Sequence, residues 1–157
     1  ENVALGASVG EGSIFLSSRL SAVSSMAESS LTRGRFAAEL VDAKAEVVPI
    51  LTLEDMLGKH GIPGFCKIDV EGYEIEVVRG LRSRIPAISL EVNIEFLDEI
   101  KHCIHLLDGL GLTSFNFSIG EQNSLVFLEW KSSPHMVEFL ESQKDPLFWG
   151  DIYAKVP

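Results

Sequence analysis

The stretch that decides the fold is Phe65-Cys66-Lys67-Ile68-Asp69-Val70-Glu71-Gly72-Tyr73-Glu74-Ile75-Glu76-Val77-Val78-Arg79-Gly80. An apolar run over 65–70 predicts a buried strand, and the pattern then changes to the spacing of an amphipathic helix over 72–81. A strand that leads directly into a helix is typical of open α/β sheets, in which ligands bind at the carboxyl ends of parallel strands. We therefore expect Asp69 and Glu71 to lie at the edge of a binding site.

The segments downstream continue the alternation of strand and helix. Residues 87–92 predict a second buried strand, and 93–110 predict a long amphipathic helix ended by Gly109 and Gly111. Segments 113–119 and 124–130 alternate like antiparallel strands around a polar turn, which predicts a hairpin. A short helix over 134–143 and a packed tail over 147–156 complete the chain.

The pattern is weaker upstream of residue 65. Residues 3–5, 13–16 and 47–51 predict short strands, and the Ser- and Ala-rich segment 19–38 predicts a long loop suited to a lid. Thr52 and Asp55 have the spacing of a capping box at a helix start. The whole order predicts one α/β domain over 1–157, with a mostly parallel sheet, an antiparallel carboxyl-terminal hairpin and helices on both faces.

The composition narrows the classes of partner. The chain is 46% hydrophobic and has a formal net charge of -10, which indicates a packed core and argues against nucleic acid or anionic lipid as the main partner. No apolar run reaches the ~20 residues that span a bilayer. Cys66 and Cys103 fall inside predicted elements, so we expect free thiols in a reducing compartment and a cytoplasmic location.

Several motifs in order resemble one known family. Lys67 to Gly72, followed by Glu74, two hydrophobic residues and a basic-glycine pair, is similar to the signature of FkbM-type S-adenosylmethionine-dependent methyltransferases. Residues 2–6, 10–12, 51–57 and 150–154 and the serines near Ser25 resemble further family segments, so the resemblance covers nearly the whole chain. It implies a Rossmann-like methyltransferase sheet, S-adenosylmethionine as cofactor and O-methylation of a hydroxyl on a sugar or another small metabolite.

One part of the family pattern has no counterpart here. Family members begin with a strand, a glycine-rich loop and a helix that hold most of the cofactor, whereas Gly6, Gly10 and Gly12 fall in a turn-like stretch. The chain therefore resembles the carboxyl-terminal two-thirds of the catalytic domain. We expect the chain alone to bind S-adenosylmethionine weakly or not at all, and an open sheet edge to favour homo-oligomers.

A second function stays open beside the enzyme. A non-catalytic remnant of the fold that acts as a binding or interaction domain would also keep the core of the family pattern. An unrelated α/β binding protein is a third, weaker hypothesis. The residues upstream of Glu1 would separate these, because a strand followed by a glycine-rich loop there would favour the methyltransferase.

Three carboxylates are candidates for catalysis. Asp69 ends the predicted strand and could take a proton from the acceptor hydroxyl or orient that hydroxyl, although it could also only cap the next helix. Glu71 competes for that role, with the helix dipole as the structural alternative. Glu91 closes the next strand, where it could face Asp69. We expect Asp69, Val70 and Ser25 to contact the cofactor.

Other polar residues have mainly structural interpretations. Lys67 should point the same way as Asp69, either ion-paired or exposed, and Asn93 suits a helix cap. Glu74 lies in the first helical turn, so we expect Glu74→Gln to cost little. His102 and His105 are three apart in the middle of a helix without a third ligand nearby, which favours solvated histidines, and we expect no metal site.

Overall fold

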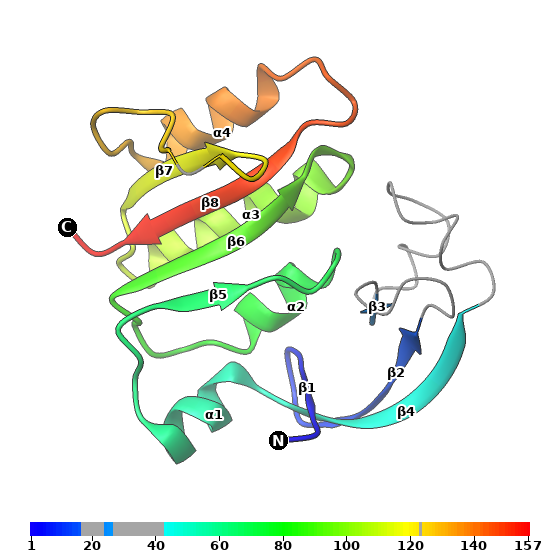
Figure 1. Cartoon of the computed structure of the whole chain (residues 1–157). Helices are drawn as coiled ribbons and strands as arrows, with labels where there is room; N and C mark the ends of the chain where they lie inside the picture. The colour runs from blue at the N-terminus through cyan, green and yellow to red at the C-terminus, as the bar shows by residue number, and fades with distance from the viewer. Residues whose placement is uncertain (17–23, 27–42, 123) are drawn as a thin grey trace.

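The computed structural model describes residues 1–16, 24–26, 43–122 and 124–157. The described strands form two four-stranded sheets, one from the amino-terminal third and one from the rest of the chain (Figure 1). The expected loop over 19–38 lies outside the described residues except for Ser24, Ser25 and Met26.

The larger sheet has the strand order β5-β6-β8-β7. Its strands are β5 (Cys66–Ile68), β6 (Ala87–Asn93), β8 (Trp149–Lys155) and β7 (Ser114–Ile119). β5 and β6 are parallel, whereas β8 is antiparallel to both of its neighbours. The sheet is therefore mixed, with β8 running against the other three strands.

The predicted carboxyl-terminal hairpin is wrong in its second strand. Segment 124–130 forms no strand, and β7 pairs instead with β8. Leu128 is fully exposed. The segment is tied to β7 by the Val126 N–H, which donates to the Phe117 carbonyl, and by the side-chain amide of Asn116, which bonds both the N–H and the carbonyl of Phe127. The tail takes the inner position because Ile152 and Ala154 alternate with polar residues and fill the core, which segment 124–130 does not.

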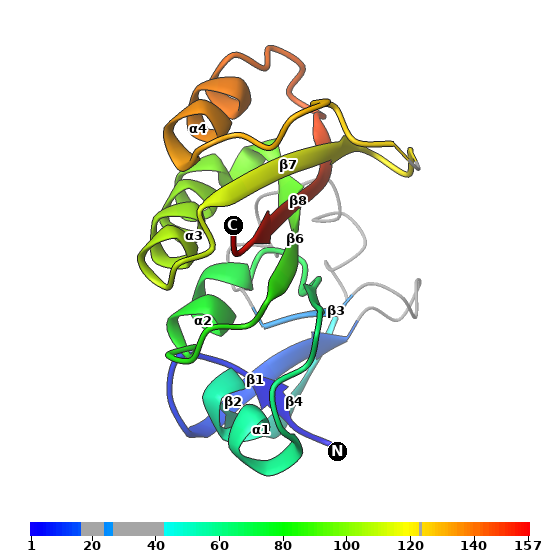
Figure 2. The same ribbon diagram turned by 90° about the vertical axis from the view of Figure 1, so that its left-hand side faces the viewer.

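Helices cover one face of this sheet. They are α2 (Glu74–Arg79), the 3₁₀ turn η2 (Ile94–Phe96), α3 (Leu97–Gly109) and α4 (Ser133–Glu141). Figure 2 shows α2, α3 and α4 on the same side of the strands. The expectation of helices on both faces is not met by the described helices, because only one face of β6 is apolar: Ile88, Leu90 and Val92 are fully buried against the helices.

The opposite face of the sheet is polar. Ser89, Glu91 and Asn93 alternate with the core residues of β6, and Glu91 pairs in register with Asp151 on β8. Glu91 is 9% exposed and Asn93 6%, so these groups are buried although they are not part of the apolar core. The strand pattern thus separates an apolar layer from a polar surface at the carboxyl ends of β5 and β6.

The predicted strand over 65–70 is shorter than expected. β5 includes only residues 66–68, Phe65 is 51% exposed, and only Ile68 is buried. β5 is the last strand of its sheet and has no partner on its outer edge among the described residues. Oligomer formation through this edge stays a prediction.

The smaller sheet has the order β1-β4-β2-β3, from β1 (Ala4–Leu5), β4 (Lys44–Leu51), β2 (Gly10–Leu16) and β3 (Ser24–Ser25). Gly10 and Gly12 lie inside β2, so the turn expected there is wrong. Helix α1 (Leu53–His60) follows β4, and its predicted capping box between Thr52 and Asp55 is confirmed.

Close backbone contacts join the smaller sheet to α2. A side chain at Gly80 would bring its Cβ within 2.3 Å of the Gly6 carbonyl oxygen, so only glycine fits. Glu54 on α1 accepts hydrogen bonds from the backbone N–H groups of Arg82 and Ser83 at 2.9 and 2.7 Å. The smaller sheet therefore has a fixed place beside the end of α2.

The cysteines and the lengths of the helices bear on two further expectations. Cys66 and Cys103 are both free, as predicted. None of the helices in the described part of the chain has the length and apolar character required to cross a bilayer.

Candidate functional site

The turn over 69–72 carries the residues that the sequence singles out. It follows β5 and precedes α2, whose amino-terminal cap position is Tyr73 with no side-chain cap bond. Asp69 therefore does not cap this helix. Glu71 has a φ of 51° and Gly72 a φ of 94°, so the chain reverses sharply at this turn.

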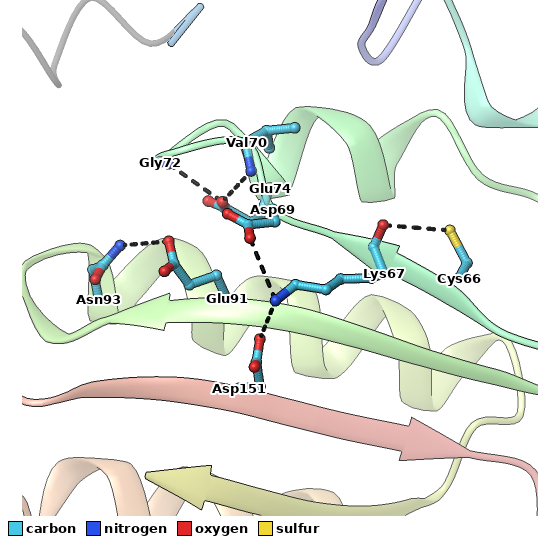
Figure 3. A network of polar contacts seen from close by, with 9 residues as sticks. All are labelled: Cys66, Lys67, Asp69, Val70, Gly72, Glu74, Glu91, Asn93 and Asp151. Atoms are coloured by element: carbon cyan, nitrogen blue, oxygen red, sulfur yellow. Dashed lines mark hydrogen bonds and ion pairs between the residues drawn. The ribbon is translucent and has the colours of Figure 1, made fainter. Parts of the chain in front are cut away.

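Lys67 joins Asp69 to a carboxylate from the other side of β6. Its Nζ lies 3.4 Å from Asp69 Oδ2 and 3.5 Å from Asp151 Oδ1. Figure 3 shows the ammonium group between the two carboxylates, with its stem reaching across the sheet. Both alternatives for Lys67 are met, because it is ion-paired while its side chain stays 50% exposed.

Burial and charge act in opposite directions on this pair. Burial alone would lower the pKa of Lys67, but its attraction to Asp151 and Asp69 outweighs burial and raises that pKa. Burial raises the pKa of Asp151, and the nearby Lys67 offsets this only in part. The pair thus holds a positive charge firmly at Lys67 and leaves Asp151 easier to protonate than an ordinary aspartate.

Glu91 and Asn93 lie side by side on β6. Asn93 occupies the amino-terminal cap position of η2, as expected, although its side chain makes no cap bond. Its Nδ2 instead donates to Glu91 Oε2 at 3.1 Å. Carboxylate oxygens of Asp69, Glu71 and Glu91 all lie within 4.8 Å of one another. The structure therefore brings together the three carboxylates that we expected to be catalytic.

The spacing of these carboxylates is one that can hold a metal ion, and they form the one such group among the described residues. Acidic side chains often have this spacing without an ion, so it assigns none. His102 and His105 are exposed on α3 and are not part of the group.

Two cavities meet at Asp69. The first, of about 260 Å³, lies between the smaller sheet and the turn, and its lining is Val3, Ala4, Leu5, Ile14, Ser25, Met26, Asp69, Val70 and Tyr73. The second, of about 460 Å³, lies over the polar face of the larger sheet, and its lining is Lys67, Asp69, Glu71, Glu91, Gly120, Glu121, Trp149 and Asp151. Asp69 lines both.

The first cavity contains each residue that we expected to contact the cofactor. Asp69, Val70 and Ser25 come from segments more than 40 residues apart and all line it. Ser25 Oγ also donates to the Glu71 carbonyl at 2.8 Å, so β3 is attached directly to the turn. The rest of the lining is mostly apolar.

Sequence reasoning missed part of the second cavity. Asp151 and Trp149 come from β8, which we expected only as a packed tail, and Gly120 and Glu121 come from the end of β7. The alternation of Trp149, Asp151 and Tyr153 with small or apolar residues was the signal that could have placed Asp151 on the polar face.

One comparison with known proteins identifies the family of the chain. A family model described as "Methyltransferase FkbM domain" matches residues 1–145, which is most of the chain. The chain belongs to the FkbM methyltransferase family, as the motif at 67–80 predicted. Searches of curated proteins and of solved structures gave no match. Asp151 and the rest of β8 lie beyond the matched residues.

Proposed function

We propose that this domain is an S-adenosylmethionine-dependent O-methyltransferase that acts on a hydroxyl of a sugar or another small metabolite. The observation that carries the proposal is the position of Asp69 in the walls of two adjoining cavities. A transfer reaction needs two ligands whose reacting atoms meet, and a residue in both walls lies where they would meet.

The first cavity suits part of the cofactor. Its apolar lining suits the adenosyl part, and the Asp69 carboxylate offers a negative charge near the positively charged half of the molecule. At about 260 Å³ it is at the small end for a ligand of this size, so it would hold only part of it. Ser25, Asp69 and Val70 would be the contact residues. When bound, S-adenosylmethionine supplies an electrophilic methyl group.

The second cavity suits a hydroxylated acceptor. Carboxylates accept hydrogen bonds from hydroxyl groups, and Trp149 offers an aromatic surface. Two buried polar atoms on the same sheet face, Ser89 Oγ and Asn93 Oδ1, have no hydrogen-bond partner within the described part of the chain. Such buried polar atoms normally have a partner, which water would provide here, because neither residue lines the second cavity.

Asp69 has the position needed for the proton transfer. As oxygen bonds to the methyl carbon and the carbon–sulfur bond breaks, the hydroxyl proton must leave, and the Asp69 carboxylate can accept it or hold the hydroxyl in line. Lys67 Nζ lies 3.4 Å from Asp69 Oδ2, and this ion pair would hold the carboxylate in place beside the acceptor. Glu71 and Glu91 line the same wall and would orient the acceptor.

The test is methyl transfer from methyl-labelled S-adenosylmethionine to a panel of hydroxylated metabolites. We expect Asp69→Asn to lower kcat by ~10²-fold or more, the range for a lost general base, with an unchanged melting temperature. Glu76→Gln is the matched control, because Glu76 pairs with Arg79 and lines neither cavity. Absence of both transfer and cofactor binding would favour the alternative, a non-catalytic binding domain.

A further inference from the structure

One buried carboxylate holds the turn that carries Asp69 and Glu71. Glu74, the first residue of α2, is 4% exposed. Its Oε1 accepts hydrogen bonds from the backbone N–H of Val70 at 3.1 Å and of Gly72 at 3.3 Å. Figure 3 shows both bonds converging on this side chain. Because the two amides flank Glu71, one oxygen atom fixes both ends of the reversal.

The turn needs such support because its backbone is strained. Glu71 is the one non-glycine residue with a positive φ in the described part of the chain. A side chain in this region persists only where the surroundings hold it. The surroundings here are the Glu74 carboxylate on one side and Ser25 Oγ, which binds the Glu71 carbonyl at 2.8 Å, on the other.

The ionised form of Glu74 is unfavourable at this buried position. Burial raises the pKa of Glu74; the N–H groups of Glu74, Val70 and Gly72 lower it, and the charge of Glu91 on β6 raises it further. The charge of Glu74 also contributes to the raised pKa of Cys103 on α3. Glu76 and Arg79 are the other charged residues of α2. An apolar side chain would avoid this cost but would leave two backbone amides without their acceptor.

We propose that Glu74 is a positioning residue, whose carboxylate holds the Val70–Gly72 turn and so places Asp69 and Glu71 between the two cavities. Glu74 itself lines neither cavity. The expectation that Glu74→Gln costs little rests on the place of Glu74 in the first helical turn, whereas in the structure its carboxylate is also buried and accepts hydrogen bonds from two backbone amides. That this placement serves methyl transfer rests on the proposed function. The role of Glu74 in holding the turn does not depend on that function.

Nuclear magnetic resonance of the labelled chain tests the hold directly. The Val70 and Gly72 amide signals should follow one titration, with a midpoint above that of an exposed glutamate, about 4.3. This titration should disappear in Glu74→Gln and persist in Glu76→Gln. In Glu74→Met both amides should exchange with solvent about tenfold faster or more, because their acceptor is gone. A titration that persists in Glu74→Gln, or unchanged exchange in Glu74→Met, would overturn the proposal.

Glu74→Gln retains the shape of the side chain, so the titration decides the matter even if Glu74→Met does not fold. Binding of S-adenosylhomocysteine to the protein, measured by calorimetry, shows the functional consequence. We expect the affinity to fall about tenfold in Glu74→Met and to stay unchanged in Glu76→Gln. If the wild-type protein bound no S-adenosylhomocysteine, the proposed function would fail, while the amide measurements would still decide the role of Glu74.

Discussion

Glu91 on β6 and Asp151 on β8 are directly paired across antiparallel strands, so two carboxylates face each other on the polar side of the sheet. Like charges in this position destabilise a sheet. Lys67 reaches Asp151 from β5 and supplies the opposite charge. The paired carboxylates supply polar groups to the second cavity. They also lower the stability of the sheet, and substitution of Asp151 shows by how much.

We predict that Asp151→Asn stabilises the protein at neutral pH. Burial raises the pKa of Asp151, so the folded state binds its proton more tightly than the unfolded state. The free energy of unfolding of the wild type should therefore fall, relative to Asp151→Asn, as the pH rises from 3.8, the ordinary pKa of an aspartate, through the raised pKa. Denaturant unfolding across this range is the measurement.

Asp98→Asn is the matched control for this substitution, because the Asp98 side chain is 86% exposed and also pairs with a lysine. It should change the free energy of unfolding by no more than ~0.5 kcal/mol. Destabilisation by Asp151→Asn at neutral pH would show that Lys67 outweighs the cost of burial.

Removal of the Lys67 ammonium group should raise the pKa of Asp151. Lys67→Met should raise the pKa of Asp151 further, because the attraction of Lys67 lowers that pKa at present. The carboxyl carbon shift of Asp151, followed against pH, measures it. Lys101→Met removes an ammonium that pairs with Asp98 and Glu141 on other parts of the surface, and it should leave Asp151 unchanged.

Two glycine substitutions should have opposite effects. Gly80→Ala places a methyl group 2.3 Å from the Gly6 carbonyl oxygen and should destabilise the protein by more than ~1 kcal/mol. Gly58 lies inside α1, where an added Cβ would have no neighbouring atom within 4 Å, so Gly58→Ala should stabilise by roughly 0.5–1 kcal/mol. Thermal unfolding of both variants compares them, and equal effects would contradict the close contact between α2 and the smaller sheet.

The aromatic core around β7 should be critical for stability. Phe117 is fully buried, and its ring centroid lies 5.4 Å from those of Phe139 and Phe148. Phe117→Ala should cost roughly 3–5 kcal/mol. Phe65→Ala should cost within ~1 kcal/mol, because Phe65 is 51% exposed although the sequence predicted it to be buried. Denaturant unfolding distinguishes the two, and a small loss at Phe117 would contradict the packing.

The sequence was most informative where local pattern and burial agree. The apolar stripe on 93–110 and the strand over 87–92 predicted α3 and β6 closely, and the motif at 67–72 located two of the three carboxylates, with Glu91 at the end of the next strand as the third. Strand order was not predictable in the same way, because the insertion of β8 between β6 and β7 depends on long-range packing. Asp151 was missed for that reason: its contact with Lys67 joins residues that are distant in the sequence.

The role of Glu74 was hidden for a different reason. An acid in the first turn of a helix is common on exposed surfaces, and the sequence alone does not show that this one is buried. The role of Glu74 follows from its 4% exposure and from the hydrogen bonds that it accepts from two backbone amides. Both depend on the reversal at Glu71, which a strand-to-helix pattern does not specify.

The most direct test of the central claim is to map where S-adenosylmethionine binds. Amide shift changes in the labelled chain detect weak binding, which suits the expectation for the chain alone. We predict concentration-dependent changes at Leu5, Ser25, Val70 and Tyr73, which line the first cavity, and none at the exposed side of α4. Changes centred elsewhere in the protein, or no changes at saturating ligand, would contradict the placement of the cofactor beside Asp69.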